Sequence, residues 1–120
     1  MTIEQLKRLL ACEWIAGPEA DGDEEIVTCY AADLMSDVLA FSTPRALLLT
    51  GLTSIQSVHT ADIADMAAVV FISGKRPDSA VVSLADQKGI PILTTGLTMF
   101  EACGLLHRAG LEPASKKHES

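Results

Sequence analysis

The order of hydrophobic and polar residues along this chain changes repeatedly between the period of a strand and the period of a helix. Short runs rich in β-branched and aliphatic residues predict strands at residues 13–16, 25–30, 46–50, 67–72 and 90–93. Elsewhere apolar residues recur at helical spacing and predict helices at residues 2–10, 33–42, 54–63, 78–88 and 98–110. Strands and helices therefore alternate along most of the chain.

Several predicted helices begin or end at residues suited to those places. Thr2 with Gln5, and Thr98 with Glu101, fit the capping box that satisfies the first free N–H groups of a helix. Gly89 suits the left-handed residue that often follows the last helical turn. These residues predict where three of the helices start or stop.

The apolar residues of a helix also predict which side of it faces the core, because they gather on one stripe. The predicted inner faces of the two short helices in the middle of the chain consist of Leu34, Met35, Val38 and Leu39 in the first, and of Ile55, Val58 and Ile63 in the second.

From residue 46 onward the predicted order is strand, helix, strand, helix, strand, helix. Parallel strands joined in this way need right-handed crossovers, which place the helices on the faces of the sheet. Residues 67–72 are apolar throughout, as expected for a strand that is buried on both faces. The predicted fold class is α/β, with three layers and a parallel or mixed sheet that carries helices on both faces.

A length of 120 residues predicts a single domain. We assign residues 1–111 to this domain and expect residues 112–120 to form a disordered C-terminal tail, because this segment has no apolar pattern to bury. Hydrophobic residues make up 48% of the chain and aromatic residues only 4%, so the predicted core is mainly aliphatic.

The formal net charge of −7 limits the classes of partner. Binding to nucleic acid or to an anionic membrane requires clustered Lys and Arg. Here basic residues are adjacent only in pairs, at residues 7–8, 75–76 and 116–117. We therefore expect neither nucleic acid nor a membrane as a partner.

The cysteines and the first residues predict the compartment. Cys12, Cys29 and Cys103 form neither a CxxC pair nor a zinc-binding spacing, which favours buried, reduced thiols. The first residues lack the basic and apolar regions of a signal peptide. The longest apolar run, residues 66–72, is too short to span a bilayer. We expect a cytoplasmic protein.

The motifs of common nucleotide-using and hydrolytic enzymes are missing from the sequence. A phosphate loop requires Ser or Thr after its Gly-Lys pair, but Arg76 follows Gly74 and Lys75. The patterns GxGxxG and GxSxG do not occur. A phosphorylation receiver would need an acidic acceptor where Thr50 and Gly51 stand. We therefore expect no catalytic residues, no cofactor and no enzyme activity.

His59, Asp62 and Asp65 recur at a spacing of three residues on one predicted helix and form the best metal-binding candidate. The same spacing describes the solvent-exposed face of any amphipathic helix, which is the commoner arrangement. We therefore predict no metal site. If the chain is an enzyme after all, these three residues are the first catalytic candidates.

The loop at residues 73–78 is the best candidate for a ligand site, because it follows the most apolar strand and precedes a helix. Ligands of open α/β sheets gather at the C-terminal ends of the strands, and a helix N-terminus favours an anion. The alternative to a ligand site is a solvated turn between a strand and a helix. The predicted ligand-binding residues are Thr50, Gly51, Ser73, Gly74, Lys75, Arg76, Asp78, Thr94 and Thr95.

Around this loop the sequence resembles a known family. Residues 68–77 (AVVFISGKRP) and, after a helix, residues 85–94 (ADQKGIPILT) are similar to the second half of DRTGG-type domains. The same pattern occurs in the N-terminal, non-catalytic domain of HPr kinase/phosphorylase. Residues 13–17 and 26–33 resemble the opening of that domain, so the resemblance covers almost the whole predicted domain.

The resemblance implies a regulatory α/β domain without the kinase core. DRTGG-type domains accompany kinases, phosphotransacetylases and inorganic pyrophosphatases as regulatory or oligomerising parts. The string that gives the family its name is absent from its expected place near residues 49–53, which read LTGLT. The role of those charged residues elsewhere does not carry over to this chain.

We therefore expect a homodimeric regulatory or ligand-sensing module that binds an anionic metabolite or a nucleotide. The alternative is a protein-binding accessory subunit of a larger redox or kinase assembly.

Overall fold

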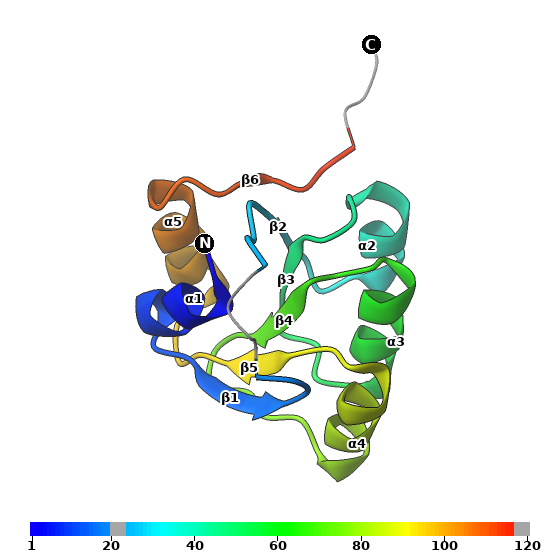
Figure 1. Cartoon of the computed structure of the whole chain (residues 1–120). Coiled ribbons are helices and arrows are strands. Elements are labelled where there is room, and N and C mark those ends of the chain that lie inside the picture. The colour runs from blue at the N-terminus through cyan, green and yellow to red at the C-terminus, as the bar shows by residue number, and fades with distance from the viewer. Residues whose placement is uncertain (20–23, 117–120) are drawn as a thin grey trace.

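The computed structural model describes residues 1–19 and 24–116, and a six-stranded mixed sheet lies at its centre (Figure 1). The strands stand in the order β1-β5-β4-β3-β2-β6 across the sheet. Their bounds are Glu13–Ala16 for β1, Thr28–Ala31 for β2, Leu47–Thr50 for β3, Ala68–Phe71 for β4, Ile92–Thr94 for β5 and Glu112–Pro113 for β6.

The four middle strands of the sheet run parallel to one another. β2 pairs with β3, β3 with β4 and β4 with β5, while β6 pairs in parallel with β2 at one side of the sheet. β1 closes the other side, antiparallel to β5. The parallel strands β2 to β5 therefore all end at one end of the sheet, which we call the carboxyl end, and all begin at the opposite, amino end.

Within the described part of the chain, five helices cover the two faces of this sheet and complete the three layers (Figure 1). α1 (Ile3–Leu10) and α5 (Met99–Arg108) lie on one face. The other face carries α2 (Met35–Phe41), α3 (Ile55–Ile63) and α4 (Ser79–Lys88). Among the described residues, no helix is long and apolar enough to cross a membrane. The predicted fold class is confirmed.

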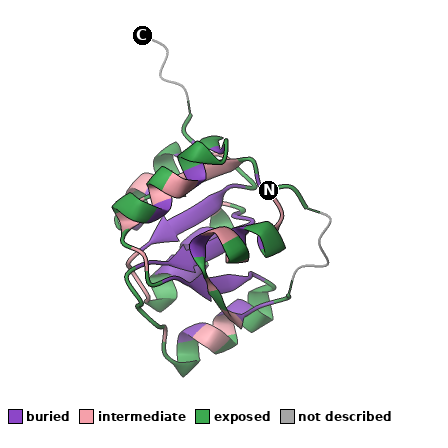
Figure 2. Ribbon diagram, turned by 90° about the vertical axis from the view of Figure 1, so that its left-hand side faces the viewer, coloured by how far each residue is buried: buried purple, intermediate pink, exposed green. Residues whose placement is uncertain are grey.

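Residues of the central strands alternate between the two faces, so the core has two parts. In β3, Leu48 belongs to the hydrophobic cluster under α2, α3 and α4, whereas Leu47 and Leu49 belong to the cluster under α1 and α5. All three side chains are fully buried, and Figure 2 shows the buried sheet between helices with exposed outer sides. Burial on both faces explains why these strands are continuous apolar runs in the sequence.

The predicted helix ends are confirmed. The hydroxyl of Thr2 accepts the N–H of Gln5 at 3.1 Å, and that of Thr98 accepts the N–H of Glu101 at 3.3 Å. Gly89 adopts the left-handed conformation after α4, with φ of 68°. These ends depend only on local hydrogen bonds and conformation, which is why the sequence predicts them.

The predicted inner face of α2 is wrong in part. Met35 and Val38 are buried, but Leu34 and Leu39 are 59% and 44% exposed. Leu34 is the extended residue before the first turn rather than part of the helix. Leu39 lies a further 100° around the helix from Val38, because successive helical residues are separated by about that angle. A helix this short turns only one narrow stripe toward the sheet.

The predicted inner face of α3 is also wrong in part. Val58 is buried, but Ile55 and Ile63 are 41% and 73% exposed. α3 packs against both α2 and α4, so its buried side consists largely of short side chains that allow neighbouring helices to approach. The buried residues of α3 are Ser57, Val58, Thr60 and Ala61.

The segment after residue 111 is not the free tail that we expected. Its backbone extends the sheet, because Glu112 N–H donates to Val27 O at 3.0 Å and Ala114 N–H donates to Cys29 O at 2.9 Å. The side chain of Ala114 is only 1% exposed. The expectation of disorder is therefore wrong for residues 112–116, where backbone pairing rather than an apolar pattern holds the chain. Residues 117–120 lie outside the described residues.

The second strand begins later than predicted. Residues 25–27 lie outside β2, and the N–H of Ile26 donates instead to the carbonyl of Met1 at 2.7 Å. Ile26 is nevertheless buried. The apolar pattern therefore predicted its burial correctly but not its hydrogen-bond partner.

Candidate functional site

The carboxyl end of the sheet brings together most of the predicted ligand-binding residues. Thr50 ends β3, Thr94 ends β5, and the loop after β4 carries Lys75 and Arg76. The hydroxyl of Thr94 donates to the carbonyl of Lys75 at 2.7 Å, which ties this loop to β5. Lys75 Nζ in turn donates to the carbonyl of Gly51 at 3.3 Å, which ties the loop to the end of β3.

A carboxylate that sequence reasoning did not assign to the site organises this end of the sheet. Asp33 follows β2, and its Oδ1 accepts the N–H of Gly51 at 2.7 Å and the hydroxyl of Thr50 at 3.3 Å. A methyl group placed on Gly51 would lie 3.2 Å from Lys75 Nζ and 3.3 Å from Asp33 Oδ1. Gly51 thus leaves room for a cation and a carboxylate on either side of it. The available signal was an acidic residue placed directly after a strand.

Three backbone N–H groups of the loop after β4 are bonded within the protein. Ser73 N–H donates to Leu97 O at 2.7 Å, and Gly74 N–H donates to Thr95 O at 2.8 Å. Lys75 N–H donates to Ile72 O at 3.2 Å. These three donors are therefore used inside the protein.

The start of α4 is likewise occupied by the chain itself. Asp78 Oδ1 accepts the N–H groups of Ala80 and Val81 at 3.1 and 3.2 Å. A carboxylate at this position interacts favourably with the positive end of the helix dipole. Asp78 therefore acts as a helix cap, and it takes the place that we had expected an anionic ligand to use.

Thr95 has a structural role as well. It is 1% exposed, and its hydroxyl donates to the carbonyl of Leu10 at 2.6 Å, which joins the end of β5 to the end of α1. Arg76 extends to the surface, where its guanidinium pairs with the carboxylate of Glu13, and both side chains are more than half exposed. Of the predicted set, Ser73, Lys75, Arg76 and Asp78 are exposed, and Lys75 and Arg76 are the cations among them.

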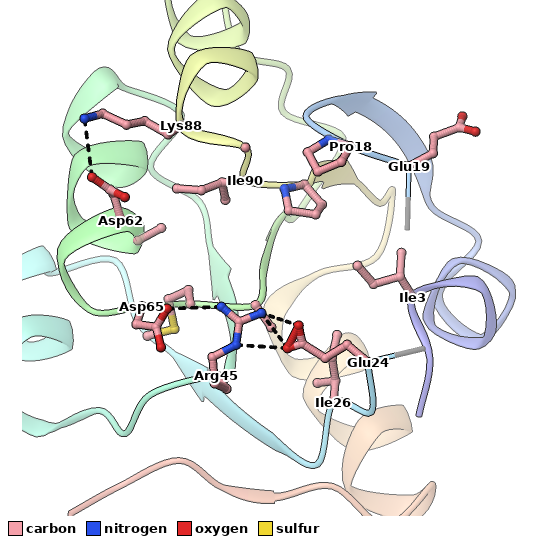
Figure 3. A pocket seen from close by; sticks show the side chains of 15 residues that line it. Ile3, Pro18, Glu19, Glu24, Ile26, Arg45, Asp62, Asp65, Lys88 and Ile90 are labelled. Atoms are coloured by element: carbon pink, nitrogen blue, oxygen red, sulfur yellow. Dashed lines mark hydrogen bonds and ion pairs between the residues drawn. The ribbon is translucent and has the colours of Figure 1, made fainter. Parts of the chain in front are cut away.

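A hollow of about 300 Å³ lies at the opposite, amino end of the sheet (Figure 3). Its floor is apolar and nearly buried, and Ile26, Met66 and Ile90 contribute to it. Its other lining residues include charged side chains from the segment before β2, from α3 and from α4. No pattern in the sequence predicts this hollow, because its residues come from six separate segments.

The charged residues around the hollow are paired with one another. The guanidinium of Arg45 bonds to the carboxylate of Glu24 and to Asp65 Oδ1, the latter at 3.1 Å (Figure 3). The hydrogen bond to Glu24 raises the pKa of Arg45. Lys88 Nζ lies 3.5 Å from Asp62 Oδ2. Both cations that line the hollow are therefore engaged, so an anionic ligand would have to displace a carboxylate.

The same ion pairs separate the metal-binding candidates. Asp62 pairs with Lys88 and Asp65 pairs with Arg45, while His59 is exposed on α3. Among residues 1–19 and 24–116, no three metal-ligating side chains are grouped closely enough to hold an ion.

The three cysteines are partly buried and unpaired rather than fully buried. Burial raises the pKa of the Cys12 thiol to about 11 and that of Cys29 to about 12, and it raises the pKa of Cys103 as well. A thiol reacts as the thiolate, so none of these three cysteines is activated as a nucleophile.

Comparison with known proteins identifies the fold. No protein-family model matches the sequence, and no curated protein matches it. Among solved structures, the chain is similar to the CBS and DRTGG domains of the regulatory region of Clostridium perfringens pyrophosphatase, in complex with its activator diadenosine tetraphosphate. The TM-score is 0.74 at 14% sequence identity, over 98% of this chain and 51% of that one.

This chain thus spans about half the length of that regulatory region. At such low identity the likeness establishes the fold and leaves the ligand and the residues that bind it open. The more specific resemblance to HPr kinase/phosphorylase stays a prediction. The chain has an α/β fold similar to that of about half of this structure of CBS and DRTGG domains.

Proposed function

We propose that this chain is a non-catalytic, cytoplasmic regulatory module that senses a nucleotide or a related phosphorylated metabolite at the carboxyl end of its sheet. The observation that carries the proposal is the position of Lys75, an exposed cation whose ammonium bonds to Gly51 O beside the carboxylate of Asp33. The regulatory character of the similar structure, and the nucleotide in it, support the same class of function.

The arrangement favours a ligand that has both a phosphate and hydroxyl groups. Lys75 and Arg76 are adjacent in sequence, but Lys75 reaches Gly51 after β3 and Arg76 reaches Glu13 on β1, so each can contact a different part of a phosphorylated ligand. Contacts of such cations with phosphate oxygens are strong charge-assisted hydrogen bonds. The ion pair of Arg76 with Glu13 is exposed on both sides, and such pairs contribute only about 0–1 kcal/mol, so a phosphate can replace it. Asp33 would repel a bare anion but accepts hydrogen bonds from hydroxyl groups. A nucleotide offers both kinds of group, whereas inorganic phosphate offers one.

Hydrogen bonds connect the loop that carries Lys75 to the segment before α5, and α5 lies on one face of the sheet. Ser73 and Gly74, which precede Lys75, are bonded to the carbonyls of Leu97 and Thr95. The segment that contains those carbonyls leads into α5. Both Ser73 and Gly74 have left-handed backbone conformations, with φ of 61° and 70°. Movement of this bent loop on ligand binding would therefore act on the start of α5.

The test is a thermal-shift titration with adenine and uridine nucleotides, sugar phosphates and inorganic phosphate. A ligand at 100 times its dissociation constant adds about 2.7 kcal/mol of stability, which is enough to move the midpoint by several degrees. We expect the shift with a nucleotide, a smaller shift with inorganic phosphate, and loss of both in a Lys75→Ala, Arg76→Ala double variant.

The matched control is the Lys7→Ala, Arg8→Ala double variant, which removes the same charge from α1. It should respond to the nucleotide as the wild type does. An equal loss of response in both double variants would show that net charge, rather than the site, controls binding. A wild-type protein that responds to none of the compounds would contradict the sensing function.

The alternative, a protein-binding accessory subunit of a redox or kinase assembly, is favoured by one specific observation. Large apolar side chains are exposed on separate helices, with Phe100 on α5 at 89% and Ile63 on α3 at 73%. Large exposed apolar residues become informative when they form a surface that a partner covers. A stoichiometric complex that is lost on changing Ile63→Ser would support this alternative.

A further inference from the structure

The outer side of α5 carries a short stripe of exposed residues arranged around a glycine. Gly104 lies near the middle of the helix, and Phe100, Glu101, His107 and Arg108 surround it on the exposed side. Phe100 is 89% exposed, the highest value of any large hydrophobic residue that the structure describes. No described part of the chain covers this ring, although burial of an aromatic side chain is favourable.

Gly104 makes the centre of the stripe flat. A methyl group added there would meet no atom within 4 Å, so the fold of a single copy gives no steric reason for glycine. Glycine inside a helix is less favourable than alanine. Glycine allows a second helix to approach closely, as other small residues also do at helix crossings.

The residues on either side of Gly104 form a self-complementary set. Phe100 and His107 are separated by two helical turns and lie on one side of Gly104, and Glu101 and Arg108 lie on the other side by the same rule. When a second α5 crosses antiparallel at Gly104, Phe100 lies opposite His107 of the second copy. Glu101 then lies opposite Arg108 of the second copy.

Both contacts are favourable in this orientation. Two aromatic rings meet on one side, and a carboxylate meets a guanidinium on the other. A parallel two-fold crossing would instead place Glu101 opposite Phe100 of the second copy and Arg108 opposite His107, so that neither charge meets a group of opposite sign. The charges therefore select a two-fold antiparallel arrangement, which is the symmetry of most homodimers.

We propose that α5 is the contact helix of a homodimer, in which two copies of the chain cross antiparallel at Gly104. The occupant of the stripe is a second copy of this chain, because the stripe is complementary to itself in charge and in shape. This surface is separate from Lys75 and from the hollow at the amino end. It is joined to the loop before Lys75 only through the segment that precedes α5.

The decisive experiment tests whether the two-fold axis of the dimer passes close to residue 104. In a two-fold crossing at residue 104, the two copies of that residue are adjacent, so Gly104→Cys should form a disulfide-linked dimer when treated with glutathione disulfide. Two thiols are oxidised to one disulfide, and each glutathione disulfide yields two glutathione molecules. Ile63→Cys, an equally accessible thiol on α3, serves as the control and should remain largely unlinked under the same conditions.

The second measurement is the mass of the wild type in solution by analytical ultracentrifugation, together with Phe100→Ser. We expect a two-chain mass for the wild type and at least a tenfold weaker dimer for Phe100→Ser, whose fold should be intact because the ring is exposed. A wild type that stays monomeric overturns the proposal. A dimer that does not cross-link through Gly104→Cys also overturns it, because that dimer uses another surface.

Discussion

The two ends of the sheet differ in what they offer a ligand. The amino end has a hollow with an apolar floor, but both lysine and arginine side chains there are held by carboxylates. The carboxyl end has Lys75, an exposed cation that no carboxylate among the described residues pairs with, beside Arg76, which is paired with Glu13. Its polar groups come from the ends of four neighbouring strands. The hollow and the exposed cation thus lie at opposite ends of the same sheet.

This difference shows that a hollow alone is a poor guide to function in this fold. The parallel strands all end at the carboxyl end of the sheet, where short loops lead into helices. Ligands of α/β sheets gather at this end. At the amino end the chain returns from helices to strands. Its charged residues, such as Arg45 and Asp65, form ion pairs between the loops that lead from helices to strands. We therefore expect substitutions of the exposed cations at the carboxyl end to alter binding, and substitutions of groups that hold the chain together, at either end, to alter stability.

The largest expected effect is at Gly17, which packs against the amino end of β5. Its φ of 79° is left-handed, and a Cβ there would lie 2.0 Å from the carbonyl oxygen of Ile90. Gly17→Ala should lower the free energy of unfolding by about 3 kcal/mol or more, since backbone must move to relieve the clash. Gly96→Ala, at the carboxyl end and in open space, should change it by less than about 0.5 kcal/mol. Urea denaturation of both variants tests the contrast.

The next effect concerns Asp33 at the carboxyl end. Asp33→Ala removes the acceptor for the Gly51 N–H and the Thr50 hydroxyl, and we expect a loss of about 1–2 kcal/mol in unfolding free energy. Asp33→Asn keeps an oxygen in the same place and should lose less than half of that. Equal losses in the two variants, measured by the same urea denaturation, would mean that the negative charge matters more than the hydrogen bonds.

The smallest effect is expected at Arg45, where two contributions oppose each other. Its φ of 59° is left-handed, which costs a residue other than glycine about 1–2 kcal/mol. Its ion pairs with Glu24 and Asp65 are half exposed and contribute about 1 kcal/mol or less each. Arg45→Ala loses the pairs and keeps the strain, whereas Arg45→Gly loses both. The glycine variant should therefore have the higher melting temperature, and the reverse order would show that the backbone here is not strained.

The sequence predicted those parts of the molecule that depend on neighbouring residues. The capping boxes at Thr2 and Thr98, the left-handed Gly89 and the buried run of β4 each depend on a few adjacent positions. The order of strands and helices followed from the same local patterns, and right-handed crossovers then limited the architecture to three layers. This information was sufficient to predict the fold class.

The parts that were missed depend on segments distant in sequence. The role of Asp33 follows from its contact with Gly51, and the N–H of Gly74 is satisfied by Thr95. Neither partner can be identified from a local pattern. The pairing of residues 112–116 with the rest of the sheet was missed for the same reason, because a strand of two residues has no periodicity to detect. These long-range hydrogen bonds determine which polar atoms remain available to a ligand.

The strand order has a consequence for how the protein folds as it is synthesised. The middle strands β2, β3 and β4 pair in the order in which they leave the ribosome, but β1 must wait for β5, and the outer side of β2 stays open until Glu112 has emerged. Contacts between distant segments slow folding, and an open strand edge can pair with another chain. Nascent or truncated chains that end before Glu112 should therefore be the species most prone to aggregate.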